Sequence, residues 1–213
     1  GNVQTAESLL VARALMTPTV YNHHVARISK AMVRRAGERL LDSTEYDAED
    51  LRRMDDPGFL VALRRGEETA EVARRFDERD LYKRAVWAEH SNVPEHVLDI
   101  EHEDVRGYEL EIAERAGVDP DQVVLDVPGE PTMDESSTRV LVGGEARRLD
   151  QQSPLVEALQ SAQLAQWRLG VYCPEAVTDQ VGTAAARVLD LDIDGALVSE
   201  VRGLQGTLDQ YGQ

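Results

Sequence analysis

The hydrophobic residues in the first third of the chain recur at the spacing expected of amphipathic helices. Apolar positions three and four residues apart predict one helix over residues 4–16 and a second from Pro18 to about Leu41. The segments that follow, as far as residue 76, alternate turns with short helical stretches. We therefore expect residues 1–76 to form a helical part.

The pattern changes after residue 77, where β-branched and aromatic residues gather in short runs. Three of these runs, "RDLYKRAVWAEH", "DQVVLDV" and "WRLGVYC", predict strands, and Gly143-Gly144 between two apolar runs predicts a β-hairpin. Helical stretches lie between them, so residues 77–190 are expected to form an α+β region, followed by a polar tail over residues 191–213. The expected fold class of the whole chain is α+β, mainly helical at first and then mixed.

Composition narrows the class of protein. Apolar residues make up 42% of the 213 residues, which is enough to build the core of one fair-sized domain or two small ones. The chain has no apolar run of about 18 residues, so we expect no membrane partner, and its first residues do not resemble a signal peptide. The single cysteine, Cys173, excludes an intramolecular disulfide, and we expect a cytoplasmic location.

The charge balance is strongly acidic. The chain has 40 acidic and 23 basic residues, a net charge of −17, and its only lysines are Lys30 and Lys83. Hydrated carboxylates with little lysine are typical of a high-salt cytoplasm, in which surface repulsion is screened, so we hypothesise a halophilic source. Nucleic acid is not an expected partner, because binding a polyanion requires a basic surface.

The basic residues are unevenly distributed. Residues 1–41 contain six basic and two acidic residues, a local net charge of +4. Within the second predicted helix, His23, Arg27, Lys30 and Arg34 follow one another at steps of four, three and four, which places them on one ridge. Such a row binds an anion such as phosphate or, alternatively, pairs with the acidic remainder of the protein.

No complete metal site or nucleophile is expected in this chain. The sequence has no HExxH motif, no His-Asp dipeptide and no CxxC motif. His23 and His24 are adjacent, so on a helix their side chains point about 100° apart and do not readily share one ion. Cys173 lies at the end of a predicted strand, where a buried and inert thiol is expected. We therefore predict neither catalytic nor metal-ligating residues.

The segment "AESLLVARALMTPTVYNHHVARISKAM" resembles the region that follows the metal-binding core in HD-domain deoxynucleoside triphosphate triphosphohydrolases of the archaeal type. The residues that match the family pattern are Arg13, Met16, Tyr21, His23 and His24. Three later pieces, "RRMDDPGFLVALRR", "RRFDERDLYKRAVW" and "WRLGVYCPE", follow in the order seen in the family. The resemblance covers most of residues 1–190 and makes residues 1–76 similar to the end of an HD-type helical core.

The resemblance implies roles for these residues. Arg13 would approach the triphosphate of a nucleoside triphosphate substrate, and Tyr21 would lie against its sugar and base. His23 and His24 would lie near a subunit interface where effector nucleotides bind, and the row that continues through Arg27, Lys30 and Arg34 is assigned to the same contact. The resemblance also implies that the protein forms a homo-oligomer. Thr17-Pro18-Thr19 departs from the family pattern, which often has histidine and arginines there.

The family's divalent metal is held by a His-Asp pair and other ligands that this sequence lacks. The chain is therefore expected to be the C-terminal portion of a longer HD-type phosphohydrolase, or a remnant without catalysis. The longer protein would convert a deoxynucleoside triphosphate to deoxynucleoside and triphosphate, while this chain alone would bind no metal and have no activity. The alternative is a non-catalytic module for nucleotide-dependent regulation or oligomerisation.

The acid excess yields a testable expectation. On dialysis from molar salt into low salt, repulsion among the carboxylates is no longer screened, so the chain should lose its folded structure. Far-ultraviolet circular dichroism across a salt series measures the change. An unchanged spectrum and an unchanged Tm at low salt would contradict the halophile hypothesis.

Overall fold

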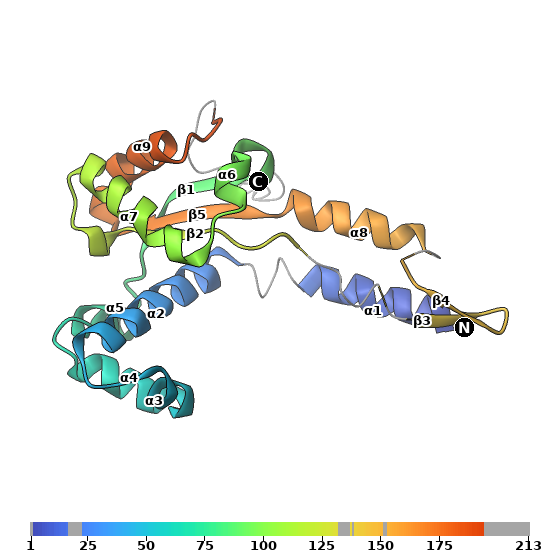
Figure 1. The fold of residues 1–213 in the computed structure, drawn as a ribbon, viewed down its shortest axis with the longest axis horizontal. Helices are drawn as coiled ribbons and strands as arrows, with labels where there is room; N and C mark the ends of the chain where they lie inside the picture. Colours follow the sequence, from blue (N-terminus) through green and yellow to red (C-terminus); the bar gives the residue numbers. More distant parts are fainter. Residues whose placement is uncertain (1, 17–22, 132–136, 138, 151–152, 194–213) are drawn as a thin grey trace, which may run out of the picture.

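The computed structural model describes residues 2–16, 23–131, 137, 139–150 and 153–193, and its elements confirm the α+β fold class (Figure 1). The helices are α1 (Asn2–Met16), α2 (His24–Ser43), α3 (Ala48–Arg53), α4 (Asp56–Arg65), α5 (Ala70–Glu78), α6 (Glu95–Leu98), α7 (His102–Ala116), α8 (Pro154–Ala165) and α9 (Thr178–Val188). The strands are β1 (Lys83–Glu89), β2 (Val124–Asp126), β3 (Arg139–Val142), β4 (Glu145–Arg148) and β5 (Arg168–Cys173). Short 3-10 turns among the described residues include η2 (His90–Asn92), η3 (Pro120–Gln122) and η5 (Glu175–Val177).

The short helices α3 and α4 follow aspartate N-cap residues. The Asp47 carboxylate accepts a hydrogen bond from the Asp50 amide while the Asp50 carboxylate accepts one from the Asp47 amide, which forms a capping box at the start of α3. At the start of α4, the Asp55 carboxylate accepts the Gly58 amide at 2.8 Å, and Pro57 occupies the first turn. The acidic stretches between the helices therefore define where α3 and α4 begin.

A three-stranded antiparallel sheet forms the centre of the fold, with β5 between β1 and β2. All six residues of β5 are buried, because helices cover both faces of the sheet. On one face Leu169, Val171 and Cys173 pack with α7 and α9. On the other face Tyr172 packs with α2, α4 and α5. The alternation along β5 thus produces two separate hydrophobic cores.

The hairpin predicted at Gly143-Gly144 is confirmed and belongs to an arm that extends away from the sheet (Figure 1). Both glycines have positive φ, 62° and 89°, which a tight turn between twisted strands requires. The arm consists of α1, α8 and the β3–β4 hairpin, which bury Leu10, Val140, Leu149 and Val156 together. Leu9, Leu15 and Leu141 on the same arm are exposed. No helix among the described residues is long and apolar enough to span a bilayer.

Arg27 connects α2 to the sheet. Its guanidinium makes an ion pair with Asp126 at the end of β2, with a closest N···O distance of 2.7 Å, and donates a hydrogen bond of 2.7 Å to the carbonyl of Arg168 in β5. The guanidinium also lies over the ring of Trp87 in β1, 4.7 Å from its centroid. One buried side chain of α2 therefore contacts all three strands of the sheet, and we call this contact the Arg27 clamp.

Tyr172 makes a second contact to Asp126, the carboxylate of the Arg27 clamp. Its hydroxyl donates to the Asp126 carboxylate at 2.9 Å, and burial raises the pKa of Tyr172, so the hydroxyl keeps its proton. The neighbouring Gly170 has no side chain where a Cβ would collide with the Tyr172 ring. Asp126 thus receives hydrogen bonds from both Arg27 and Tyr172, which satisfies a carboxylate that is largely removed from water.

Removing the clamp should destabilise the fold. Arg27→Ala leaves the Asp126 carboxylate without its cation, so we expect a loss of about 3 kcal/mol in the free energy of unfolding. Lys30→Ala, an exposed position one turn further along the same helix, is the matched control and should change it by no more than about 0.5 kcal/mol. Urea unfolding measures both values, and equal shifts in the two variants would contradict the clamp.

Candidate functional site

A pocket of about 480 Å³ opens between the start of α2 and the connection from α5 to β1. Its lining residues are His24, Val25, Ile28, Arg79, Leu81, Tyr82, Lys83 and Arg84. The first three come from α2, and the other five lie close together in sequence where α5 ends and β1 begins. Because basic residues line it and no aspartate or glutamate does, we call it the cationic pocket.

Two cations of this pocket, Arg79 and Lys83, differ from most arginines of the described chain. Salt bridges to carboxylates engage Arg27, Arg35, Arg39, Arg52, Arg53, Arg64, Arg74, Arg75, Arg106, Arg147, Arg148 and Arg168. Within the described residues, in contrast, the side chains of Arg79 and Lys83 have neither an ion pair nor a hydrogen bond. Two uncompensated positive charges around one pocket attract an anion.

The backbone at the start of α2 adds to the positive potential. His24 and Val25 belong to the first turn of α2, the end of the helix at which backbone amide N–H groups point outward. His23 is the N-cap residue, and its side chain makes no capping hydrogen bond in the part of the chain that the structure describes. The helix dipole places partial positive charge at this end, which favours a bound anion beside Arg79 and Lys83.

Another part of the pocket lining is apolar. Tyr82 is buried, its hydroxyl donates to the Asp121 carbonyl at 3.2 Å, and burial raises the pKa of Tyr82. The guanidinium of Arg75 lies over the Tyr82 ring, 5.4 Å from its centroid. Ile28 and Leu81 continue the apolar surface beside this ring. A ligand with an anionic group and a flat or apolar portion fits such a lining.

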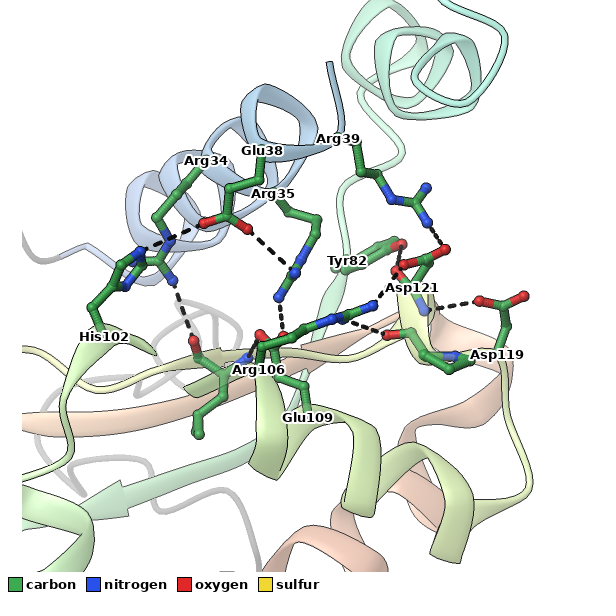
Figure 2. A network of polar contacts seen from close by, with 12 residues as sticks. Arg34, Arg35, Glu38, Arg39, Tyr82, His102, Arg106, Glu109, Asp119 and Asp121 are labelled. Atoms are coloured by element: carbon green, nitrogen blue, oxygen red, sulfur yellow. Dashed lines mark hydrogen bonds and ion pairs between the residues drawn. The ribbon is translucent and has the colours of Figure 1, made fainter. Parts of the chain in front are cut away.

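A second polar site lies between α2, α7 and η3 and is shown in Figure 2. At its centre the fully buried carboxylate of Glu109 binds the guanidinium of Arg35 from α2 and that of Arg106 from its own helix, and it accepts the Leu125 amide at 2.9 Å. Asp121 binds both Arg39 and Arg106. Burial lowers the pKa of Arg39, although the group stays charged at neutral pH.

This second site is internally neutralised. It surrounds a cavity of about 510 Å³, but five of its lining residues other than Glu109 are acidic: Glu38, Asp42, Glu68, Glu103 and Asp121. Each cation drawn at its centre in Figure 2 already faces a carboxylate or a carbonyl oxygen. The arrangement joins α2 to α7 and β2, and its charges leave little attraction for an external anion. The cationic pocket is therefore the stronger candidate site.

The predicted basic row of α2 divides into two groups. Arg27 forms the clamp, and Arg34 donates a hydrogen bond of 3.3 Å to the Leu125 carbonyl in β2, so both side chains contact the sheet. Lys30 is exposed, and His23 stacks on His24 with ring centroids 4.4 Å apart. Of the residues assigned to an effector or interface contact, only His24 lines the cationic pocket.

The two residues assigned to a substrate contact are Arg13 and Tyr21. Arg13 is exposed near the end of α1, on the arm. Tyr21 falls outside the described residues. The structure therefore gives no geometry for the predicted convergence of Arg13 and Tyr21, and their roles stay predictions.

The described residues provide neither a cluster of metal ligands nor a reactive thiol. Among the described residues, no three His, Cys, Asp or Glu side chains come together in a way that would hold a metal ion. The ligand set implied by the HD-type resemblance therefore does not fit the residues present there. Cys173 is fully buried, and burial raises the pKa of its thiol to about 12, so the reactive thiolate does not form at neutral pH.

Arg79, Lys83 and Tyr82 were not identified from the sequence. The local signal is the segment "RDLYKR", in which basic residues flank an aromatic residue within six positions. The β-favouring residues of that segment predict the start of a strand and do not indicate a ligand contact. The position of Arg79 and Lys83 around one pocket, both without a carboxylate partner among the described residues, depends on tertiary structure.

Comparisons with known proteins place the chain in a family. The family described as "HD associated region" has a model that matches residues 1–200. The uncharacterized protein MJ1154 of Methanocaldococcus jannaschii is 28% identical over 177 residues, which cover 81% of this chain and 38% of that protein. This chain thus spans less than two fifths of that relative's length. No solved structure matches this chain. Because the family match extends over nearly the whole chain, the chain belongs to the HD associated region family.

Proposed function

We propose that this chain is the nucleotide-binding part of an HD-type phosphohydrolase that hydrolyses nucleoside triphosphates. In the longer protein, a deoxynucleoside triphosphate and water would give deoxynucleoside and triphosphate. The divalent metal that supports this reaction would be held by HD-type ligands outside this chain, because the chain has no His-Asp dipeptide. This chain would supply contacts to phosphate and nucleoside.

The cationic pocket is the observation that carries this proposal. Arg79 and Lys83 offer five and three N–H donors, respectively, and neither is engaged by a carboxylate among the described residues. They would bind the phosphate groups, together with the first turn of α2. Tyr82 and the aliphatic side chains of Ile28 and Leu81 would contact the nucleoside.

The resemblance adds two residues to this proposal. Arg13 would contact the triphosphate of the substrate, and Tyr21 would contact its sugar and base. His23, the N-cap residue of α2, and Lys30, within α2, are exposed and would belong to an effector or subunit contact. The protein would act in the cytoplasm as a homo-oligomer.

A second candidate function is a non-catalytic module for nucleotide-dependent regulation or oligomerisation. Two observations favour it. The cationic pocket has no carboxylate that would bring a metal ion to the bound phosphates. The arm exposes Leu9 and Leu15, 70% and 66% accessible, which a second copy of the chain would cover. In this case the pocket would bind an effector nucleotide rather than the substrate.

Nucleotide binding can be measured directly on this chain. We expect dATP and inorganic triphosphate to bind, and Lys83→Ala to weaken both about tenfold, because a charge-assisted contact to phosphate is lost. The control is Arg115→Ala, an exposed cation in the last turn of α7 that removes the same charge away from the pocket. Isothermal titration calorimetry at constant ionic strength gives the Kd values. If neither ligand binds the wild-type chain, or if both variants weaken binding equally, the pocket assignment is wrong.

The role of Arg13 requires the longer protein with its metal site. Arg13→Ala there should lower kcat/KM for a deoxynucleoside triphosphate by about a hundredfold while leaving the circular dichroism spectrum unchanged, because a guanidinium contact to the triphosphate is removed. Steady-state release of triphosphate measures the effect. Activity close to that of the wild type would contradict a substrate contact at Arg13 and leave the second candidate function in its place.

A further inference from the structure

Three helices of this chain end in the same backbone motif, in which a residue with positive φ follows the last turn. At the end of α5, Arg79 has φ 58°, and the Asp80 amide donates to the Arg75 carbonyl at 2.9 Å. At the end of α7, Gly117 has φ 68°, and the Val118 amide donates to the Ala113 carbonyl at 3.0 Å. Both bonds span six residues and define the Schellman motif.

The third helix, α9, ends at Asp190 with φ 49°, and the Leu191 amide donates to the Ala186 carbonyl at 3.0 Å. Gly117 and Asp190 are residue types that tolerate the left-handed conformation, since glycine has no Cβ and aspartate bonds locally to the backbone. Arginine has neither property. Arg79 therefore occupies a strained position that glycine fills in α7 of the same chain.

The strain at Arg79 brings no compensating contact within the described residues. The side chain has no ion pair or hydrogen bond there, and it is exposed where it lines the cationic pocket. A cation at a helix C-terminus does interact favourably with the helix dipole, but Arg75 already provides one in the last turn of α5. The position is thus occupied by a residue type that is unfavourable for this backbone conformation and that lines the pocket.

We propose that Arg79 is a ligand-contacting residue that selects an oligophosphate, meaning two or more linked phosphate groups, over a single phosphate. This inference rests on the proposed function of the cationic pocket. The guanidinium binds one phosphate in a bidentate manner, and Lys83 with the first turn of α2 binds the next, so all the cationic groups are used only by a chain of phosphates. Arg79 lines the pocket although its left-handed backbone conformation favours glycine.

Two substitutions separate the strain from the charge. Arg79→Gly removes both, so we expect Tm to rise by about 2–4 °C and the affinity for inorganic triphosphate to fall about tenfold. Arg79→Ala removes the charge but keeps a Cβ at positive φ, so the affinity should fall equally while Tm stays within about 1 °C of the wild type. Inorganic monophosphate, the second probe, should bind the wild-type chain at least tenfold more weakly than triphosphate and should discriminate little between the variants.

Gly117→Ala is the matched control for the conformation. A Cβ at Gly117 would meet no atom within 4 Å, so its only effect is the cost of positive φ, and Tm should fall by about 2–4 °C with unchanged affinity for triphosphate. Thermal unfolding and calorimetric titration of the four proteins give all these values. If the wild-type chain binds no triphosphate, the proposed function fails. If it binds, and Arg79→Gly binds equally well or has a lower Tm, the role of Arg79 alone is overturned.

Discussion

The Arg27 clamp is the interaction on which the arrangement of this protein depends. Arg27 is the point where a helix from the first part of the chain meets all three strands of the central sheet. Since Asp126 and the Arg168 carbonyl hold the guanidinium, the start of α2 is fixed relative to β1. The cationic pocket lies between the same turn of α2 and the beginning of β1, so its shape follows from this contact. Glu109 fixes the middle of α2 in a similar way through Arg35.

The elements of the fold were largely predictable from local patterns. The β-branched and aromatic runs gave β1, β2 and β5, and Gly143-Gly144 gave the hairpin, because side-chain shape and turn conformation act over a few residues. The order β1–β5–β2 was not predictable, because it depends on pairing between segments about 45 to 90 residues apart. The first helix also has a partner that periodicity does not reveal, since α1 packs on α8 and β3 in the arm.

The candidate site was less predictable than the fold, for an electrostatic reason. The sequence correctly placed Arg27 and Arg34 on one ridge of a helix, but the acceptors of that ridge lie about 90 to 140 residues away, in β2 and β5. A row of charges in sequence therefore indicated a shared face and not whether that face is free. Arg79 and Lys83 are ordinary surface cations in sequence. What sets them apart in the described structure is that two cations without a carboxylate partner line the same pocket, in a chain with 40 acidic residues.

The same acid excess explains why an uncompensated pocket is informative. In a chain with a net charge of −17, many surface arginines pair with a carboxylate, as Arg64, Arg74 and Arg75 do. Keeping Arg79 and Lys83 free of such partners leaves local repulsion that a bound anion would relieve. A ligand there would also contact the first turn of α2. Because such a ligand would bind only the folded chain, its binding free energy would add to the stability that the Arg27 clamp provides. Occupancy of the pocket would thereby stabilise the contact between α2 and the sheet, and a change in that contact would in turn alter the affinity of the pocket.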